Sequence, residues 1–154
     1  MNRRTALIAT PLIATALVAT LGITPGRADA HPDNANPFAT HKLVLQLSDG
    51  SMDKQNAIIS AANSVLKDYP NTVSIVVVAF GPGVRILYAN APLREAVDSL
   101  VSQGVEFDVC MNTIDTIKRK TGHAPKLNPH ATPVPYGIPR IMELVSEGYI
   151  LVRP

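Results

Sequence analysis

"VSIVVVAF" (residues 73–80) is the stretch that most constrains the fold. As a strand it is apolar on both faces, so it needs cover on both sides, as the strands of parallel sheets have. Gly81-Pro82-Gly83 follows directly and ends the strand. We therefore expect a parallel sheet that lies between two layers of helices.

Strand-like and helical segments alternate along the rest of the chain. Short apolar runs predict strands at 42–48, 73–80, 105–110 and 149–152. Apolar residues at helical spacing predict helices that end at Pro70, Gly104, Gly122 and Gly148. Residues 84–89 fit either a short strand or an irregular connection, and the proline-rich stretch 123–135 is expected to be a loop. The alternation predicts one α/β domain over residues 41–154, with a parallel sheet flanked by helices on both faces.

The last two helices carry specific expectations. Asn112 is expected to cap the third helix, with the basic residues 118–120 at its negative end. The fourth helix is expected over residues 138–147. One face of it should hold Ile138, Ile141, Met142 and Val145.

Residues 1–30 have the pattern of a signal peptide. Arg3 and Arg4 form a short basic head, the stretch 6–23 has no charge, and Ala28-Asp29-Ala30 fits a signal-peptidase site. An uncleaved anchor, a lipid-tethered form and twin-arginine export are the alternatives. We expect cleavage, a disordered arm at 31–40, no membrane span in the mature protein, and a periplasmic or secreted location.

The charge balance argues against a polyanionic partner. The chain has 14 Lys and Arg and 12 Asp and Glu, and each total becomes 11 when Arg3, Arg4, Arg27 and Asp29 are set aside. The mature chain is therefore near neutral, without a basic stripe and with little aromatic surface for stacking bases. No nucleic-acid partner is expected.

Cys110 is the single cysteine. Exported small domains usually pair their cysteines, so a lone one is either a buried structural residue or a thiol with a function. Ligands of parallel sheets bind at the carboxyl ends of the strands. Cys110 should meet Ser48-Asp49-Gly50 and Gly81-Pro82-Gly83 there, which makes Asp49, Gly81 and Gly83 candidate binding residues.

The position of Cys110 before a helix suits a nucleophile. A thiol reacts as its anion, which the N-terminus of a helix favours. Asn112 and the Thr113 hydroxyl are candidate substrate-binding groups, although capping alone also accounts for both. The backbone N–H groups of Gly81 and Gly83 are candidates to hold an anion beside the thiol.

The sequence predicts neither a metal site nor a cofactor. His123 and His130 stand seven residues apart in a proline-rich loop, without a second cysteine or an HExxH motif. Gly81-Pro82-Gly83 lacks the spacing of a phosphate-binding loop. One minor alternative is copper chelation by an N-terminal His31 after cleavage.

Four stretches together resemble the DsrE/DsrF-like (YchN-like) family, especially its exported single-domain branch. They are "LVLQLSD" (43–49), "VVVAFGPGVRIL" (76–87), "FDVCMNT" (107–113) and "VPYGIPRIMELVSEGYILVRP" (134–154). The resemblance implies an α/β domain that assembles as homo-trimers or hexamers. In sulfur-relay members a strand-end cysteine carries sulfur as a persulfide, and Cys110 is the matching position.

Three functional hypotheses follow. The first is sulfur handling through Cys110 as persulfide carrier or sulfurtransferase-like relay, with a sulfur donor or acceptor protein as partner. The second is a non-catalytic oligomeric module that binds a small ligand or partner and keeps Cys110 as a structural residue. The third is redox signalling through an intermolecular disulfide.

Overall fold

The computed structural model of the protein describes residues 36 and 38–154. The expected signal peptide, residues 1–30, lies outside them, as does most of the expected arm. Within the described part of the chain, no helix has the length and apolar character needed to cross a membrane. At the end of the arm, Asn36 donates from Nδ2 to the Asn71 carbonyl at 2.7 Å, and the Thr40 N–H donates to Thr72 O. These residues are held against the domain rather than free.

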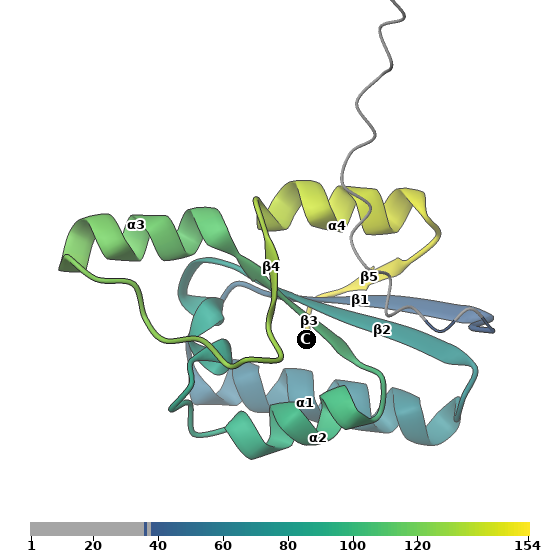
Figure 1. The fold of residues 1–154 in the computed structure, drawn as a ribbon. Helices are drawn as coiled ribbons and strands as arrows, with labels where there is room; N and C mark the ends of the chain where they lie inside the picture. Colours follow the sequence, from purple (N-terminus) through teal and green to yellow (C-terminus); the bar gives the residue numbers. More distant parts are fainter. Residues whose placement is uncertain (1–35, 37) are drawn as a thin grey trace, which may run out of the picture. The chain divides into compact units, whose positions relative to one another are not determined.

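Five parallel strands form one sheet in the order β4-β3-β2-β1-β5 (Figure 1). Their bounds are β1 His41–Leu47, β2 Val73–Ala79, β3 Glu106–Cys110, β4 Thr132–Val134 and β5 Ile150–Val152. β2 lies in the middle, and all seven of its residues are buried. The expectation from its doubly apolar sequence is therefore confirmed.

Helices lie on both sides of the sheet, as predicted (Figure 1). They are α1 Met52–Asp68, the 3₁₀ helix η1 Gly81–Leu87, α2 Arg94–Ser102, α3 Met111–Thr121 and α4 Gly137–Ser146. Residues 84–89, left open between a strand and an irregular connection, belong mostly to η1. α3 begins at the carboxyl end of β3 and packs mainly against η1, beyond the end of the sheet.

The core has one part on each face of the sheet. On one face Leu45, Ile75, Val77 and Phe107 belong to a cluster completed by buried residues of α1, α2 and η1. On the other face, side chains of β1 and β2 pack in a smaller cluster with side chains of α4 and with Tyr149. Its members are Val44, Val76, Val78, Ile141, Leu144 and Tyr149. Both clusters come from adjacent residues of the same strands, because side chains alternate between faces.

Two elements differ from the sequence expectation. β4 lies within the stretch expected to be a loop. Its Pro133 has no N–H to donate, which is tolerated because β4 is an edge strand and pairs on one side only. In α4 the four expected apolar residues share one face, but only part of that face is buried. Ile141 is buried, but Ile138, Met142 and Val145 are 50%, 67% and 45% exposed, so the apolar face of the helix extends beyond its contact with the sheet.

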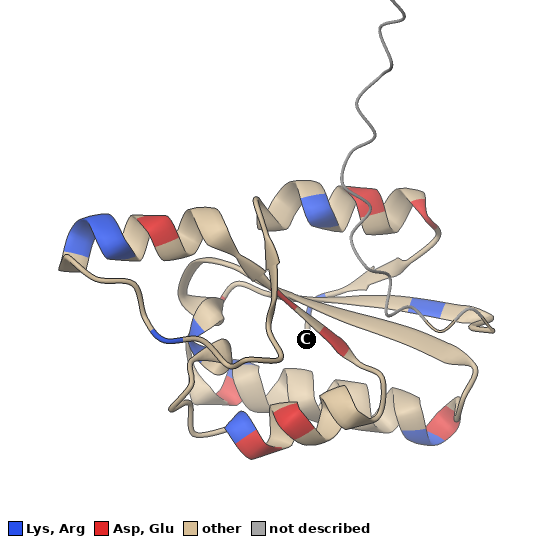
Figure 2. Cartoon of the chain, viewed as in Figure 1, with Lys and Arg blue, Asp and Glu red and all other residues tan. Residues whose placement is uncertain are grey.

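Charged residues of both signs are spread over the helices, and cations gather at the C-terminal end of α3 (Figure 2). Gly122 follows that end in the left-handed conformation at φ 84°, as the sequence indicated. β3 itself contains two acidic residues, Glu106 and Asp108, and red segments mark acidic residues in Figure 2. Acidic residues inside a buried strand are unusual and need a cationic neighbour.

Candidate site at the carboxyl ends of the strands

The carboxyl ends of β1, β2 and β3 lie on one rim of the sheet, as their parallel pairing requires. The Phe80 N–H donates to Leu47 O at 3.0 Å, which holds the start of η1 against the end of β1. Gly83 lies against Leu47 O so closely that a Cβ would overlap this carbonyl oxygen. Gly83 is thus required for close backbone packing, and its own N–H donates to Phe80 O.

Two of the predicted binding residues are brought together. The Gly81 N–H donates to Thr113 Oγ1 at 3.0 Å, joining the first residue of η1 to the first turn of α3. Both residues line a groove of about 540 Å³ between η1 and α3. The Gly81 N–H is therefore already used and does not point at a ligand, in contrast to the sequence hypothesis that it holds an anion.

Cys110 is the last residue of β3 and also the N-cap residue of α3. This corrects the expectation that Asn112 caps the helix. Asn112 lies inside the first turn and donates its N–H to Pro135 O at 3.2 Å. Cys110 is buried, with 4% of its surface exposed. Alternation along β3 puts it on the same face as Asp108 and Glu106.

A second groove, of about 400 Å³, adjoins Cys110 without including it. Met111 and Asn112, the next residues in the chain, line it. So does Val134, the residue of β4 that pairs with Cys110. The groove is completed by Asp115, Pro133, Pro135 and Tyr136. Because Cys110 is 4% exposed and does not line the groove, a ligand there reaches its thiol only if neighbouring residues move.

Asp49 lies apart from both grooves. Its Oδ1 accepts the Ser51 N–H at 2.7 Å, and this hydrogen bond lowers the pKa of the exposed carboxyl. It lines a smaller groove of about 160 Å³, which it shares with Lys54 and Arg153. The structure therefore gives Asp49 a turn-forming role, and does not bring it into the groove with Thr113.

The sequence interpretation missed a buried charge cluster between α4 and β3. Arg140 Nε donates to Asp108 Oδ2 at 3.0 Å, and its Nη2 is 3.9 Å from Glu106 Oε1. Asp108 is fully buried, and Glu106 and Arg140 are nearly so. Burial alone would lower the pKa of Arg140, but the hydrogen bond and the charges of the two carboxylates outweigh it and raise the pKa. The signal in the sequence was two acidic residues at alternate positions of a buried strand.

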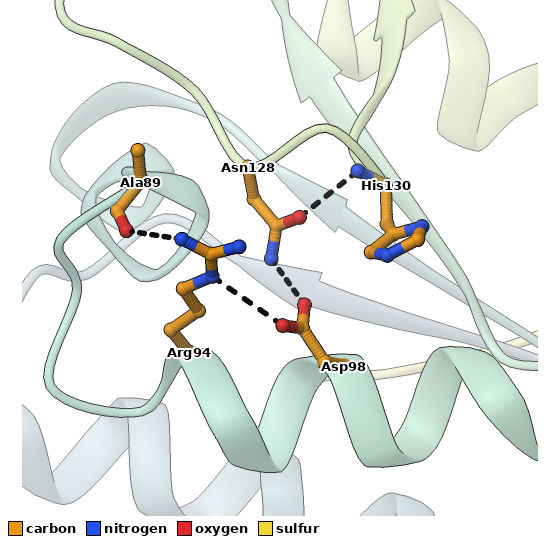
Figure 3. A network of polar contacts seen from close by, with 5 residues as sticks. All are labelled: Ala89, Arg94, Asp98, Asn128 and His130. Carbon is orange, nitrogen blue, oxygen red and sulfur yellow. Dashed lines mark hydrogen bonds and ion pairs between the residues drawn. The ribbon is translucent and has the colours of Figure 1, made fainter.

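A second polar network joins the loop before β4 to α2 (Figure 3). The buried Asn128 donates from Nδ2 to Asp98 Oδ1 at 2.6 Å and accepts the His130 N–H at 2.9 Å. Arg94 reaches Asp98 Oδ2 at 3.4 Å and donates to the Ala89 carbonyl at 3.0 Å. The network fixes the loop that leads into β4, and thereby the strand beside Cys110.

The two loop histidines do not come together as ligands. His123 Nδ1 lies 3.1 Å from Thr121 O, and the His130 N–H is bonded to Asn128. Within residues 36 and 38–154, no group of three His, Cys, Asp or Glu side chains is placed to hold a metal ion. His31, the alternative copper ligand, lies outside the described residues.

No family model matches the chain, and no curated protein matches it. Among solved structures, the chain is similar to a protein of unknown function from Methanobacterium thermoautotrophicum. The two share 27% identity and a TM-score of 0.67, over 74% of this chain and 99% of the other. This similarity supports the α/β fold and names no activity.

Proposed function

We propose that the protein is an exported, DsrE/DsrF-like protein of the periplasm or secreted space that handles sulfane sulfur through Cys110. The observation that carries the proposal is the place of Cys110. It ends an interior parallel strand and is the N-cap residue of α3, where the dipole of the helix favours an anion. Thiolate and persulfide are both anions.

The chemistry needs two displacements and no outside oxidant. The Cys110 thiolate attacks the outer sulfur of a donor such as thiosulfate. The S–S bond of the donor breaks, and sulfite leaves with the electron pair. An acceptor thiolate then attacks the outer sulfur of the Cys110 persulfide, and Cys110 leaves as a thiolate. In this proposal donor and acceptor approach from the groove lined by Met111, Asn112 and Pro135, and the residues between this groove and Cys110 move to admit them.

Intact-mass spectrometry tests this function. The full chain is incubated with thiosulfate or polysulfide, desalted without reductant and weighed beside Cys110→Ser. We expect wild type to gain one sulfur atom and the serine variant to gain none, because serine differs only in the nucleophile. Absence of the adduct in wild type, or its presence in Cys110→Ser, would refute the proposal.

The burial of Cys110 favours a second candidate, a non-catalytic oligomeric module that keeps this residue as a small core side chain. In that case the sulfur adduct is absent, whereas Cys110→Ser loses stability because it places a hydroxyl in a buried site. An intermolecular disulfide, the third hypothesis, needs the sulfur at the surface, and an exposed fraction of 4% does not favour it.

We also propose that copies of the chain associate through α4 and β5. β5 is an edge strand of three apolar residues, Ile150, Leu151 and Val152, which are 69%, 44% and 40% exposed. They and three exposed residues of α4, Ile138, Met142 and Val145, provide six of the large hydrophobic side chains that are exposed. Exposed edges and apolar patches of this kind are typical of protein–protein contacts.

A further inference from the structure

The groove between η1 and α3 does not involve Cys110, and it has the size of a ligand site. Its volume is about 540 Å³, within the roughly 300–1,000 Å³ typical of small-molecule pockets. One wall comes from η1 and the other from α3, and the hydrogen bond from Gly81 N–H to Thr113 Oγ1 joins them. The relative position of the two walls is thereby fixed before any ligand binds.

The charged groups of this groove are all cationic. Arg85 on η1 and Lys120 on α3 line it, and no Asp or Glu does. Within residues 36 and 38–154, neither cation has a carboxylate within ion-pair distance, whereas Arg94 and Arg140 do. The guanidinium of Arg85 and the ammonium of Lys120 are therefore available to an anion.

Thr113 adds a hydrogen-bond donor to the same groove. Its Oγ1 accepts the Gly81 N–H, and no acceptor for its own hydroxyl hydrogen is found in the described part of the chain. The neighbouring Thr116 differs, since its hydroxyl donates to Asn112 O at 2.8 Å and accepts from Arg119. The Thr113 hydroxyl can thus donate to a ligand without breaking the contact that joins the walls.

Apolar surface accompanies these polar groups. Tyr88 and Ile117 are half-buried and line the groove with their remaining surface. We propose that this groove binds a small organic anion, with its acidic group held by Arg85, Lys120 and the Thr113 hydroxyl. The apolar or aromatic part of the ligand lies against Tyr88 and Ile117. Binding of this kind does not require sulfur chemistry at Cys110.

Titration of the isotope-labelled full chain with 3-phenylpropionate, followed by NMR amide shifts, tests the site. We expect saturable shifts at Arg85, Thr113 and Ile117 with a Kd of about 1 mM or tighter, which suits a ligand of this size. The neutral analogue 3-phenylpropan-1-ol should bind at least about threefold more weakly, because it lacks the charge.

The matched variants are Lys120→Gln and Lys118→Gln. Lys118 is an exposed lysine of the same helix that does not line the groove. Lys120→Gln and Arg85→Gln should each raise the Kd at least about threefold, and Lys118→Gln should leave it unchanged. Cys110→Ser should bind like wild type, which separates this result from the sulfur assay. Shifts that do not saturate by about 10 mM, equal binding of the neutral alcohol, or equal effects of the two lysine variants would overturn the site.

Discussion

At the scale of single residues, Asn128 shows how the loop before β4 is held. Its side chain is buried and uses both amide ends, donating to Asp98 and accepting the His130 N–H (Figure 3). Its backbone N–H donates to Leu87 O at 2.8 Å. One residue therefore joins α2, η1 and the loop.

The pKa of Asp98 reports on this contact. The hydrogen bond from Asn128 is the largest cause that lowers this pKa below its ordinary 3.8, and Arg94 lowers it further. Asn128→Ala should therefore raise the Asp98 pKa toward 3.8, as measured by NMR of the side-chain carboxyl. The pKa of Asp49, which Ser51 lowers, should stay unchanged in this variant and is the control. An unchanged Asp98 pKa would contradict the assignment.

The lowered pKa of Asp98 also predicts how the stability of the fold changes with pH. Because the pKa of Asp98 is lower in the folded protein, its contribution to stability is present above pH 3.8. This contribution is lost as the pH falls through the lower, folded value. Over that pH range the free energy of unfolding should therefore decrease more steeply with falling pH in wild type than in Asn128→Ala.

At the scale of elements, Arg140 joins α4 to the sheet. It lies within 3.0 Å of Asp108 and 3.9 Å of Glu106, so two buried carboxylates of β3 share its charge. Glu143, one turn further along α4, contributes a longer contact of 3.8 Å to the same guanidinium. The position of α4 over β3 therefore depends on charge as well as on the apolar contacts of Ile141 and Leu144.

Arg140→Met should destabilise the fold by about 3–5 kcal/mol, because it removes the cation from two buried acids while it keeps much of the side-chain volume. Urea unfolding at neutral pH measures the loss. Arg119→Met on the exposed face of α3 is the matched control, with an expected change of about 0.5 kcal/mol or less. If the two variants lose similar stability, the cluster is not what holds α4.

At the scale of the whole molecule, the exposed stripe of α4 and the edge strand β5 suggest assembly. Ile138, Met142 and Val145 recur at helical spacing and lie beside Ile141 on the apolar face of α4. An apolar face wider than its contact with the sheet fits a helix whose exposed edge contacts a second copy.

Met142→Lys should convert the assembled protein to monomers, because it places a charge in the middle of the proposed contact. Sedimentation velocity measures the change in mass. Ser60→Lys on the exposed side of α1 adds the same charge elsewhere and should leave the assembly intact. A wild-type monomer, or a Met142→Lys variant that assembles like wild type, would show that this surface is not the contact.

The sequence predicted the architecture well because its evidence was local. The doubly apolar β2, the helix-ending glycines and the strand–helix alternation follow from side-chain pattern alone. β4 was missed because Pro133 argues against a strand, and only pairing with β3 makes Thr132–Val134 one. In α4, helical spacing placed Ile138, Ile141, Met142 and Val145 on one face but could not show that Ile141 alone of these is buried.

The candidate site was predictable in part. Parallel pairing was enough to place Gly81, Thr113 and Cys110 on one rim. It was not enough to show that Cys110 is buried. Nor could it show that Arg140, 32 residues after Asp108 in the chain, contacts this residue in the interior of β3. Such contacts depend on the helix that covers the strand, which a strand's own sequence does not specify.

The accessibility of the Cys110 thiol in the folded protein tests the central claim most directly. Iodoacetamide labelling is followed by mass spectrometry at about pH 7, below the reference value of about 8.5 for a free thiol. Denaturant dependence distinguishes labelling of the folded state from labelling through global unfolding. If Cys110 handles sulfur, wild type should react while folded, at a rate that does not follow unfolding. Labelling only at the rate or population of the unfolded chain would contradict a sulfur-handling role and leave Cys110 as a structural residue.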